Sequence, residues 1–165
     1  MYLIFDTETT GLPRNYNAPI SDSNNWPRAV QIAWQLHDQW GELIEHQDFL
    51  IAPDGFDIPY DAEKVHGIST QLAEKEGVPI AQVFKAFNEA LSKAKYVVGQ
   101  NIGFDINIMG AEFYRYGVES PITTMPVIDT CTEATANLCK IAGGRGGRYK
   151  LPTLTELHSF LFGVP

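Results

Sequence analysis

The sequence predicts a single α/β domain in which helices pack on a mixed five-stranded sheet. Short apolar segments rich in β-prone residues alternate with amphipathic ones, in the order strand, strand, strand, helices, strand, helix, strand, helix. The chain has 165 residues, 44% of them hydrophobic and 12% aromatic, which is enough for one hydrophobic core. We therefore expect residues 1–165 to form one domain.

The strand predictions depend on alternation and on turn residues. Residues 29–37 alternate as a half-buried strand does, and Gln39-Trp40-Gly41 is typical of a hairpin turn before a returning strand. The apolar face of the first of these strands would comprise Val30, Ile32, Trp34 and Leu36. The predicted strands are 2–5, 29–37, 42–52, 96–99 and 127–130, and residues 12–27 read as a long surface loop.

Capping residues and apolar periodicity predict the helices. Ser69 is a suitable N-cap for a short helix over 70–76, and Asn101 is one for a helix that runs to about Tyr116. Residues 80–95 form an amphipathic pattern. Further helices are predicted over 131–141 and 153–162, the last with Leu154, Leu157 and Leu161 facing inward.

Composition excludes some classes of protein. The formal charge of −8 argues against a histone-like or DNA-coating protein, because such binding needs excess Lys and Arg, but an enzyme can still grip nucleic acid locally. No apolar segment is long enough to span a bilayer and no signal region precedes the first strand, so we expect no membrane partner and a cytoplasmic protein. Cys131 and Cys139 would lie about 12 Å apart on a helix, too far for a disulfide.

Two carboxylates follow the first strand. Asp6 and Glu8 are two residues apart on an extended chain, so they point to the same face, close enough to share one hard cation. The plainer interpretation is a polar strand end before the turn at Gly11. A third carboxylate, Asp105, falls in the first turn of a predicted helix, where the helix dipole alone would explain an aspartate.

Taken together, these segments resemble a known family. Residues 5–11 (F-D-T-E-T-T-G) and 98–105 (V-G-Q-N-I-G-F-D) are similar to the first two motifs of the DEDD 3′–5′ exonucleases, which include the epsilon proofreading subunit of bacterial DNA polymerase III. The resemblance implies a ribonuclease H-like fold. It also implies hydrolysis of single-stranded DNA from the 3′ end to nucleoside 5′-monophosphates, in the service of proofreading.

The resemblance also assigns roles to residues. Asp6, Glu8 and Asp105 would be the catalytic carboxylates and would hold two Mg²⁺ or Mn²⁺ ions. Thr9, Leu12, His66 and Asn101 would contact the substrate, although a histidine that merely holds a turn explains His66 equally well. Asp129, in an I-D-T segment that the family shares, reads as structural, fixing the start of the next helix.

The family's third motif, H-x4-D or Y-x3-D, is missing from its place. The only match in the chain is Tyr2 with Asp6, which belongs to the first motif. Either the sequence is truncated before this motif and before the last helix of the fold, which we favour, or it is a degenerate relative that only binds. The fragment alone would then cut poorly.

Alternatives remain for the substrate and the partner. An exonuclease that trims RNA 3′ ends would fit the same motifs, and so would a non-catalytic module that binds nucleic acid or associates with a polymerase. A replicative DNA polymerase is the expected protein partner. The basic glycine-rich segment 143–150 is either a solvated loop or a segment that binds the backbone of single-stranded nucleic acid.

Overall fold

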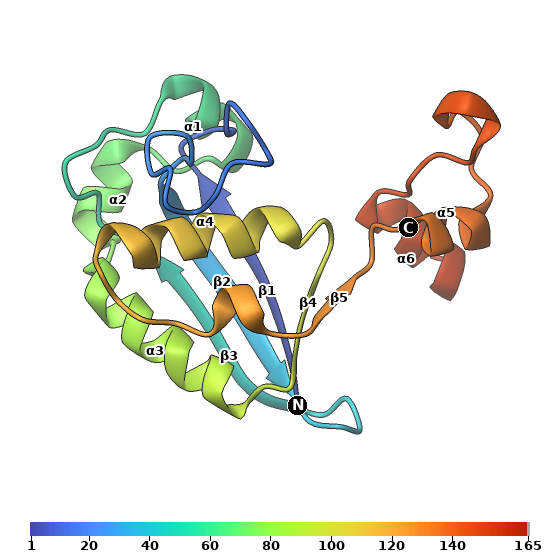
Figure 1. Ribbon diagram of the computed structural model, residues 1–165, viewed down its shortest axis with the longest axis horizontal. Coiled ribbons are helices and arrows are strands. Elements are labelled where there is room, and N and C mark those ends of the chain that lie inside the picture. The colour runs from blue at the N-terminus through green and yellow to red at the C-terminus, as the bar shows by residue number, and fades with distance from the viewer. Residues whose placement is uncertain (165) are drawn as a thin grey trace.

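The computed structural model describes residues 1–164 and has an α/β fold with a mixed five-stranded sheet in the order β3-β2-β1-β4-β5 (Figure 1). β1 pairs antiparallel with β2 and parallel with β4. The strands are β1 (Tyr2–Thr9), β2 (Ala29–His37), β3 (Leu43–Leu50), β4 (Tyr96–Gly99) and β5 (Val127–Asp129). The helices are α1 (Tyr60–His66), α2 (Thr70–Glu76), α3 (Ile80–Lys93), α4 (Gly103–Arg115), η1 (Ile122–Thr124), α5 (Glu133–Cys139), η2 (Arg145–Gly147) and α6 (Leu154–Phe162). The predicted fold class is confirmed.

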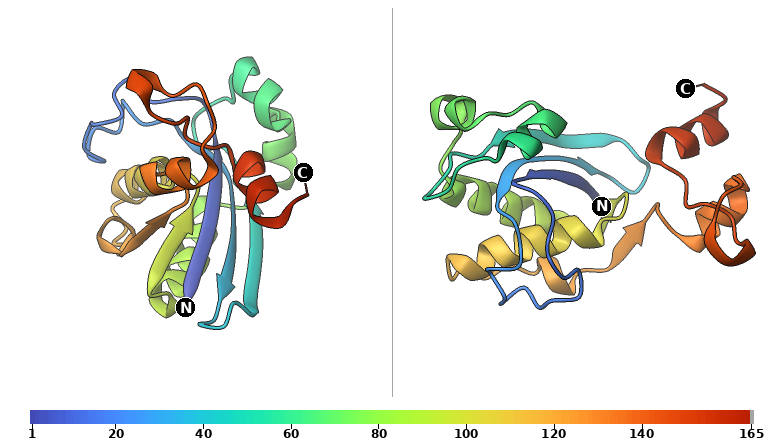
Figure 2. Two further views of the ribbon diagram at one scale, coloured as in Figure 1. Left: turned by 90° about the vertical axis from the view of Figure 1, so that its right-hand side faces the viewer. Right: turned by 90° about the horizontal axis from the view of Figure 1, so that it is seen from above.

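Burial alternates along β1 and thereby defines the two faces of the sheet. Leu3 and Phe5 are buried in the main core, which β1, β2 and β4 share with α3 and α4, whereas Ile4 and Asp6 point to the other face and are exposed. Figure 2 shows α3 and α4 on one side of β1, with α1 and α2 on the other. The carboxylates of β1 therefore lie on the less covered face.

A β-bulge corrects the predicted alternation of β2. The register of β1 with β2 shifts between Glu8 and Thr9, and Val30 is left without a partner on β1. Val30 consequently packs with Ile58 and Ala62 in a small second core under α1 and α2, and not beside Ile32. Bulges of this kind change the direction of side chains at the end of a strand, and this one adjoins the predicted site.

The five predicted helices correspond to α2, α3, α4, α5 and α6 and differ from prediction only at their ends. The Ser69 hydroxyl accepts a hydrogen bond from Leu72 N, so the predicted cap of α2 is confirmed. The helix α1 was not predicted, because it has little apolar periodicity and Pro59 precedes it without a side-chain cap. Among residues 1–164, no helix is long and apolar enough to cross a membrane.

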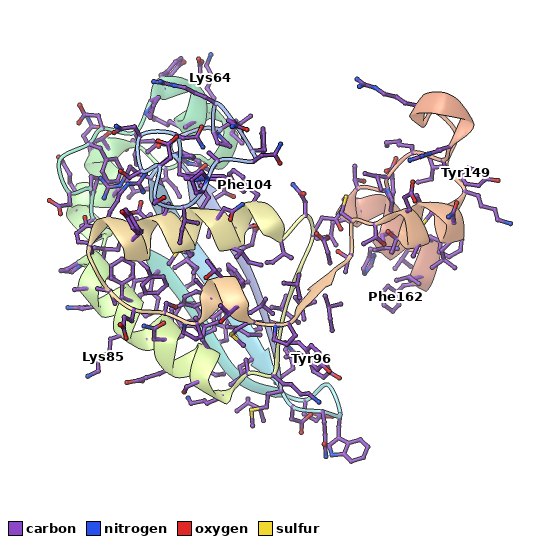
Figure 3. All side chains as sticks on the ribbon, viewed as in Figure 1. Lys64, Lys85, Tyr96, Phe104, Tyr149 and Phe162 are labelled. Carbon is purple, nitrogen blue, oxygen red and sulfur yellow. The ribbon has the colours of Figure 1, made fainter. Side chains whose placement is uncertain are left out.

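Residues 131–164, the C-terminal arm, lie beyond β5 and apart from the rest of the fold (Figures 1 and 3). The prediction of an inward face on α6 is wrong for two of its three leucines, because Leu154 and Leu161 are 60% and 53% exposed and only Leu157 is buried. α5 begins at Glu133, so Cys131 lies before the helix, and both cysteines are free and half-buried.

Phe87 on α3 tests the main core. It is fully buried, and its ring lies 5.1 Å from that of Phe5 and 5.3 Å from that of Trp34. We expect Phe87→Ala to lower the free energy of unfolding by about 3–5 kcal/mol, measured by urea denaturation, because it leaves a cavity. Trp40→Ala at the exposed hairpin tip is the control, and it should change that free energy by less than about 0.5 kcal/mol.

Candidate active site

The site begins where β1 extends past its parallel neighbour. β4 pairs with β1 only as far as Ile4, because β4 ends at Gly99 and the chain then turns into α4. The β4-side edge of β1 is therefore free from Phe5 onward. Ligands in open α/β sheets bind beyond the carboxyl ends of strands at such points of divergence.

Asp105 occupies this free edge. Thr7 donates to Asp105 Oδ1 through its backbone N at 2.9 Å and through its hydroxyl at 2.6 Å. Asp105 is the third residue of α4, in the first turn as predicted, and it is buried. Sequence alternation places Thr7 on the α4 side of β1, but no sequence signal identified Thr7 as the partner of Asp105.

Asp6 and Glu8 share one face of β1, as predicted, and this face is opposite to that of Thr7. Burial raises the pKa of the Asp6 carboxyl above its ordinary value. Burial also raises the pKa of Glu8, and the charge of Asp6 adds to this effect while that of His66 opposes it. Asp6 and His66 are therefore both close enough to Glu8 for their charges to affect its pKa.

Asp105 is the most perturbed of the three carboxyls. Its burial raises the pKa to about 7, with a further contribution from the charge of Asp6, against the lowering effect of the hydrogen bonds from Thr7. Desolvation thus outweighs the helix dipole that the sequence suggested as a reason for an aspartate here. The charge of Asp6 raises the pKa of Glu8 and also that of Asp105, so Asp6 interacts with each of the other two carboxyls.

The donor set fits a divalent metal, but the side chains are not gathered around a metal position. Among residues 1–164, no three His, Cys, Asp or Glu side chains converge closely enough to hold an ion as they stand. Carboxylate oxygens are the ligands that Mg²⁺ and Mn²⁺ prefer. Partly desolvated carboxyls, two of which have their pKa raised further by the charge of Asp6, would be stabilised by a cation between them. Asp6, Glu8 and Asp105 would hold it.

The turn after β1 is shaped by its own hydrogen bonds. The Thr9 hydroxyl donates to the carbonyl of Gly11 at 2.7 Å, and Gly11 has a φ of 149°, which suits glycine. Leu12 follows and is 74% exposed. Thr9 is buried beneath the turn, so the turn presents Leu12 and not Thr9 to solvent.

His66 lies at the end of α1 with its tautomer fixed. Its Nδ1 accepts a hydrogen bond from Ile68 N at 3.1 Å, so in the neutral ring Nε2 carries the proton. Nε2 is buried and has no hydrogen-bond partner among the described residues. His66 therefore holds a turn, as one prediction had it, and its charge also affects the pKa of Glu8.

Asn101 does not cap α4, which corrects the prediction. The cap position is Ile102, without a side-chain hydrogen bond, and Asn101 adopts a left-handed conformation with a φ of 56°. Asp129 Oδ1 accepts from Asn101 N at 2.8 Å and from Cys131 N at 2.7 Å. Asp129 is thus structural as predicted, but it joins β5 to the start of α4, and Thr132 is the residue that caps α5.

Comparison with known proteins identifies the family. The RNase T family, described as Exonuclease, matches residues 3–159. The chain belongs to this family of DEDD exonucleases, which are hydrolases.

Relatives and solved structures agree with this membership. The chain is 32% identical over 130 residues to the PolC-type DNA polymerase III of Streptococcus thermophilus, covering 78% of this chain and 8% of that one. It is 30% identical over 155 residues to the PolC-type DNA polymerase III of Pediococcus pentosaceus, covering 94% of this chain and 9% of that one. The crystal structure of E. coli Exonuclease I with a dT13 oligonucleotide superposes with a TM-score of 0.71 at 21% identity, covering 99% of this chain and 36% of that chain. This chain therefore spans a small part of each relative.

The raised pKa of Asp105 predicts a stability effect in metal-free protein. The folded state holds the Asp105 proton up to a pKa of about 7, well above the ordinary 3.8, so unfolding releases a proton and stability falls as pH rises between these values. Asp105→Asn removes this penalty and keeps an oxygen for Thr7. We expect the variant to have the higher Tm at pH 8 in a chelator, with the difference vanishing near pH 4. Parallel Tm curves would contradict the prediction.

Proposed function

We propose that this domain hydrolyses single-stranded DNA from its 3′ end and releases nucleoside 5′-monophosphates. The observation that carries the proposal is the approach of Asp105 from α4 to the strand that bears Asp6 and Glu8, with the pKa values of all three carboxyls raised. Perturbed carboxyls at the end of a sheet are typical of catalytic sites.

The relatives support the choice of substrate. Two are named as PolC-type DNA polymerase III, and a structure with the same fold was solved with a DNA oligonucleotide. We extend this to propose DNA as the substrate, proofreading as the context and a replicative polymerase as the partner.

In the proposed reaction Asp6, Glu8 and Asp105 bind divalent ions and orient the scissile phosphate. Two such ions, when bound, lower the pKa of an attacking water and stabilise the attacking and leaving oxygens. Thr7 orients Asp105 through its two hydrogen bonds, so that the second Asp105 oxygen is directed away from Thr7. Asp6 would bind a cation in its ionised form, which burial disfavours and the cation itself favours.

The substrate contacts follow from exposure and hydrogen bonding. Leu12 would pack against the terminal base, supported from beneath by Thr9, and the exposed Asn101 would reach the strand beside α4. His66 would donate its Nε2 proton to a phosphate or sugar oxygen. A ring that already carries the proton on Nε2 is a donor, so His66 does not suit the role of general base at that atom.

The general base and fourth carboxylate belong to a third motif that residues 1–165 do not contain. We propose that a further segment of the encoded protein supplies an H-x4-D motif. This would complete the single exonuclease domain.

Asp6→Ala provides the direct test. In the full encoded protein with Mg²⁺ or Mn²⁺, we expect it to abolish release of 5′-mononucleotides from a single-stranded DNA oligonucleotide. The substitution removes the one carboxyl that interacts with both Glu8 and Asp105. Matched RNA and DNA oligonucleotides distinguish the proposed activity from RNA trimming. Digestion that survives the substitution would overturn the assignment, and binding without any cleavage would favour the non-catalytic module.

The basic glycine-rich segment is the second expected contact with nucleic acid. Gln100 Nε2 donates to Pro152 O at 2.9 Å, which ties this part of the C-terminal arm to the residues before α4. Arg148 pairs with Glu133 at 2.6 Å and Lys150 with Glu156 at 2.6 Å. Among the described residues no such ion pair involves Arg145, so its charge remains available for a phosphate.

Arg145→Ala should therefore weaken binding of single-stranded DNA and reduce the slope of log K against log salt by about 1. Arg148→Ala is the matched control, with a smaller effect because Glu133 already neutralises Arg148. Filter binding or fluorescence anisotropy at several salt concentrations measures both. An unchanged slope for Arg145→Ala means that the segment is only a solvated loop.

A further inference from the structure

Glu112 is a buried carboxylate that neither the metal site nor the substrate contacts use. Its side chain on α4 is 0% exposed. It accepts hydrogen bonds from Arg28 Nε at 3.0 Å and from Ala29 N at 2.9 Å. Arg115 Nη1 lies 3.2 Å from the same oxygen.

Burial of such a charged group needs a reason other than stability. A buried ion pair is often no more stabilising than apolar residues of similar volume, although removal of one partner is costly. Arg28 is held from several sides, since its guanidinium lies 4.3 Å from the Phe56 ring and donates to Tyr116 Oη at 3.0 Å. The buried ion pairs of Glu112 with Arg28 and Arg115 therefore fix the position of Arg28 and of the backbone that contacts it.

The backbone of Arg28 is attached to the turn that follows the carboxylate strand. Thr10 N donates to Arg28 O at 3.0 Å, and Arg28 N donates to the Thr10 hydroxyl at 3.0 Å. This reciprocal pair follows directly after the β-bulge. Glu112 thus holds, through Arg28, the turn that leads to Leu12.

The long loop over 12–27 is attached to the same group. Arg115 donates to Ser23 O at 2.6 Å and also to Trp26 O, so the C-terminal part of the loop is attached to Glu112 through Arg115. Glu112 follows Asp105 by about two turns on one helix, and both side chains reach towards the strands. α4 consequently fixes the catalytic carboxyl and the substrate turn relative to each other.

We propose that Glu112 is a positioning residue for the nuclease reaction, which sets the Thr9–Leu12 turn against the end of the DNA strand. The inference rests on the proposed function. Glu112 touches neither substrate nor metal, and it acts through Arg28 and Thr10. Its loss loosens substrate binding at the turn and leaves the attachment of Asp105 to Thr7 in place.

Glu112→Gln in the full encoded protein is the first test. It keeps an acceptor for Ala29 N and removes the charge that holds Arg28 and Arg115. We expect KM for a single-stranded DNA oligonucleotide to rise about tenfold and kcat to change less than about threefold. Hydrogen exchange of the Thr10 amide should accelerate while that of Thr7 does not, whereas general destabilisation accelerates both. Glu119→Gln, an exposed carboxylate near the end of the same helix, is the control.

Thr10→Val provides a second variant that leaves the buried group intact, should Glu112→Gln not fold. It removes the acceptor for Arg28 N and should raise KM in the same way. In the double variant the two effects should not add, because both act through one linkage. Wild-type KM for both variants, additive effects, or equal acceleration at Thr7 and Thr10 would overturn the inference.

These outcomes are distinct from failure of the proposed function. An inactive wild-type protein overturns the nuclease assignment and with it the catalytic role of Glu112 as a positioning residue. Selective exchange at Thr10 in the same protein would still establish that Glu112 holds the turn. An active wild-type protein whose KM does not respond to either variant overturns the inference alone.

Discussion

The two hydrogen bonds from Thr7 to Asp105 connect the strand to the helix, and the site depends on this contact. They exist because β1 continues past the end of β4, which leaves the Thr7 amide without a strand partner. A buried amide needs an acceptor, and a carboxylate on α4 supplies it. Asp105 thereby reaches the edge of β1 from the core side, while Asp6 and Glu8 stand on the other face. Three carboxyls from two elements thus lie at one strand end, although they do not converge on a single point.

The burial of Asp105 at this contact is costly for the metal-free protein, although the hydrogen bonds from Thr7 offset part of the cost. Burial of Asp105 raises its pKa to about 7, and the charge of Asp6 adds to this. Carboxyls held close together in a partly dry site destabilise the fold when they ionise, and a cation between them reverses the effect. Functional sites commonly have this property, because the residues that a reaction needs make the protein less stable than other residues at the same positions would. The chemistry proposed for this chain uses that arrangement directly.

α4 serves the site at two points along its length. Its first turn carries Asp105, and two turns later Glu112 holds Arg28, whose backbone pairs with Thr10. A helix is stiff over this distance, so Asp105 and the turn that would receive the terminal nucleotide are held in fixed relation to each other. Precise placement of substrate against catalytic groups contributes strongly to rate. The buried charges thus have a purpose at the site that apolar residues of equal volume would not serve.

Local pattern in the sequence determined the fold class, the five strands, the common face of Asp6 and Glu8, and the first-turn position of Asp105. Each of these follows from alternation, periodicity or motif spacing among neighbouring residues. Tertiary structure decided the rest: the bulge that turns Val30 away from Ile32, the left-handed Asn101, the pairing of Thr7 with Asp105, and the attachment of Glu112 to the turn. These contacts join residues far apart in the chain, and they depend on where β4 ends and how α4 crosses the sheet, which no local pattern encodes.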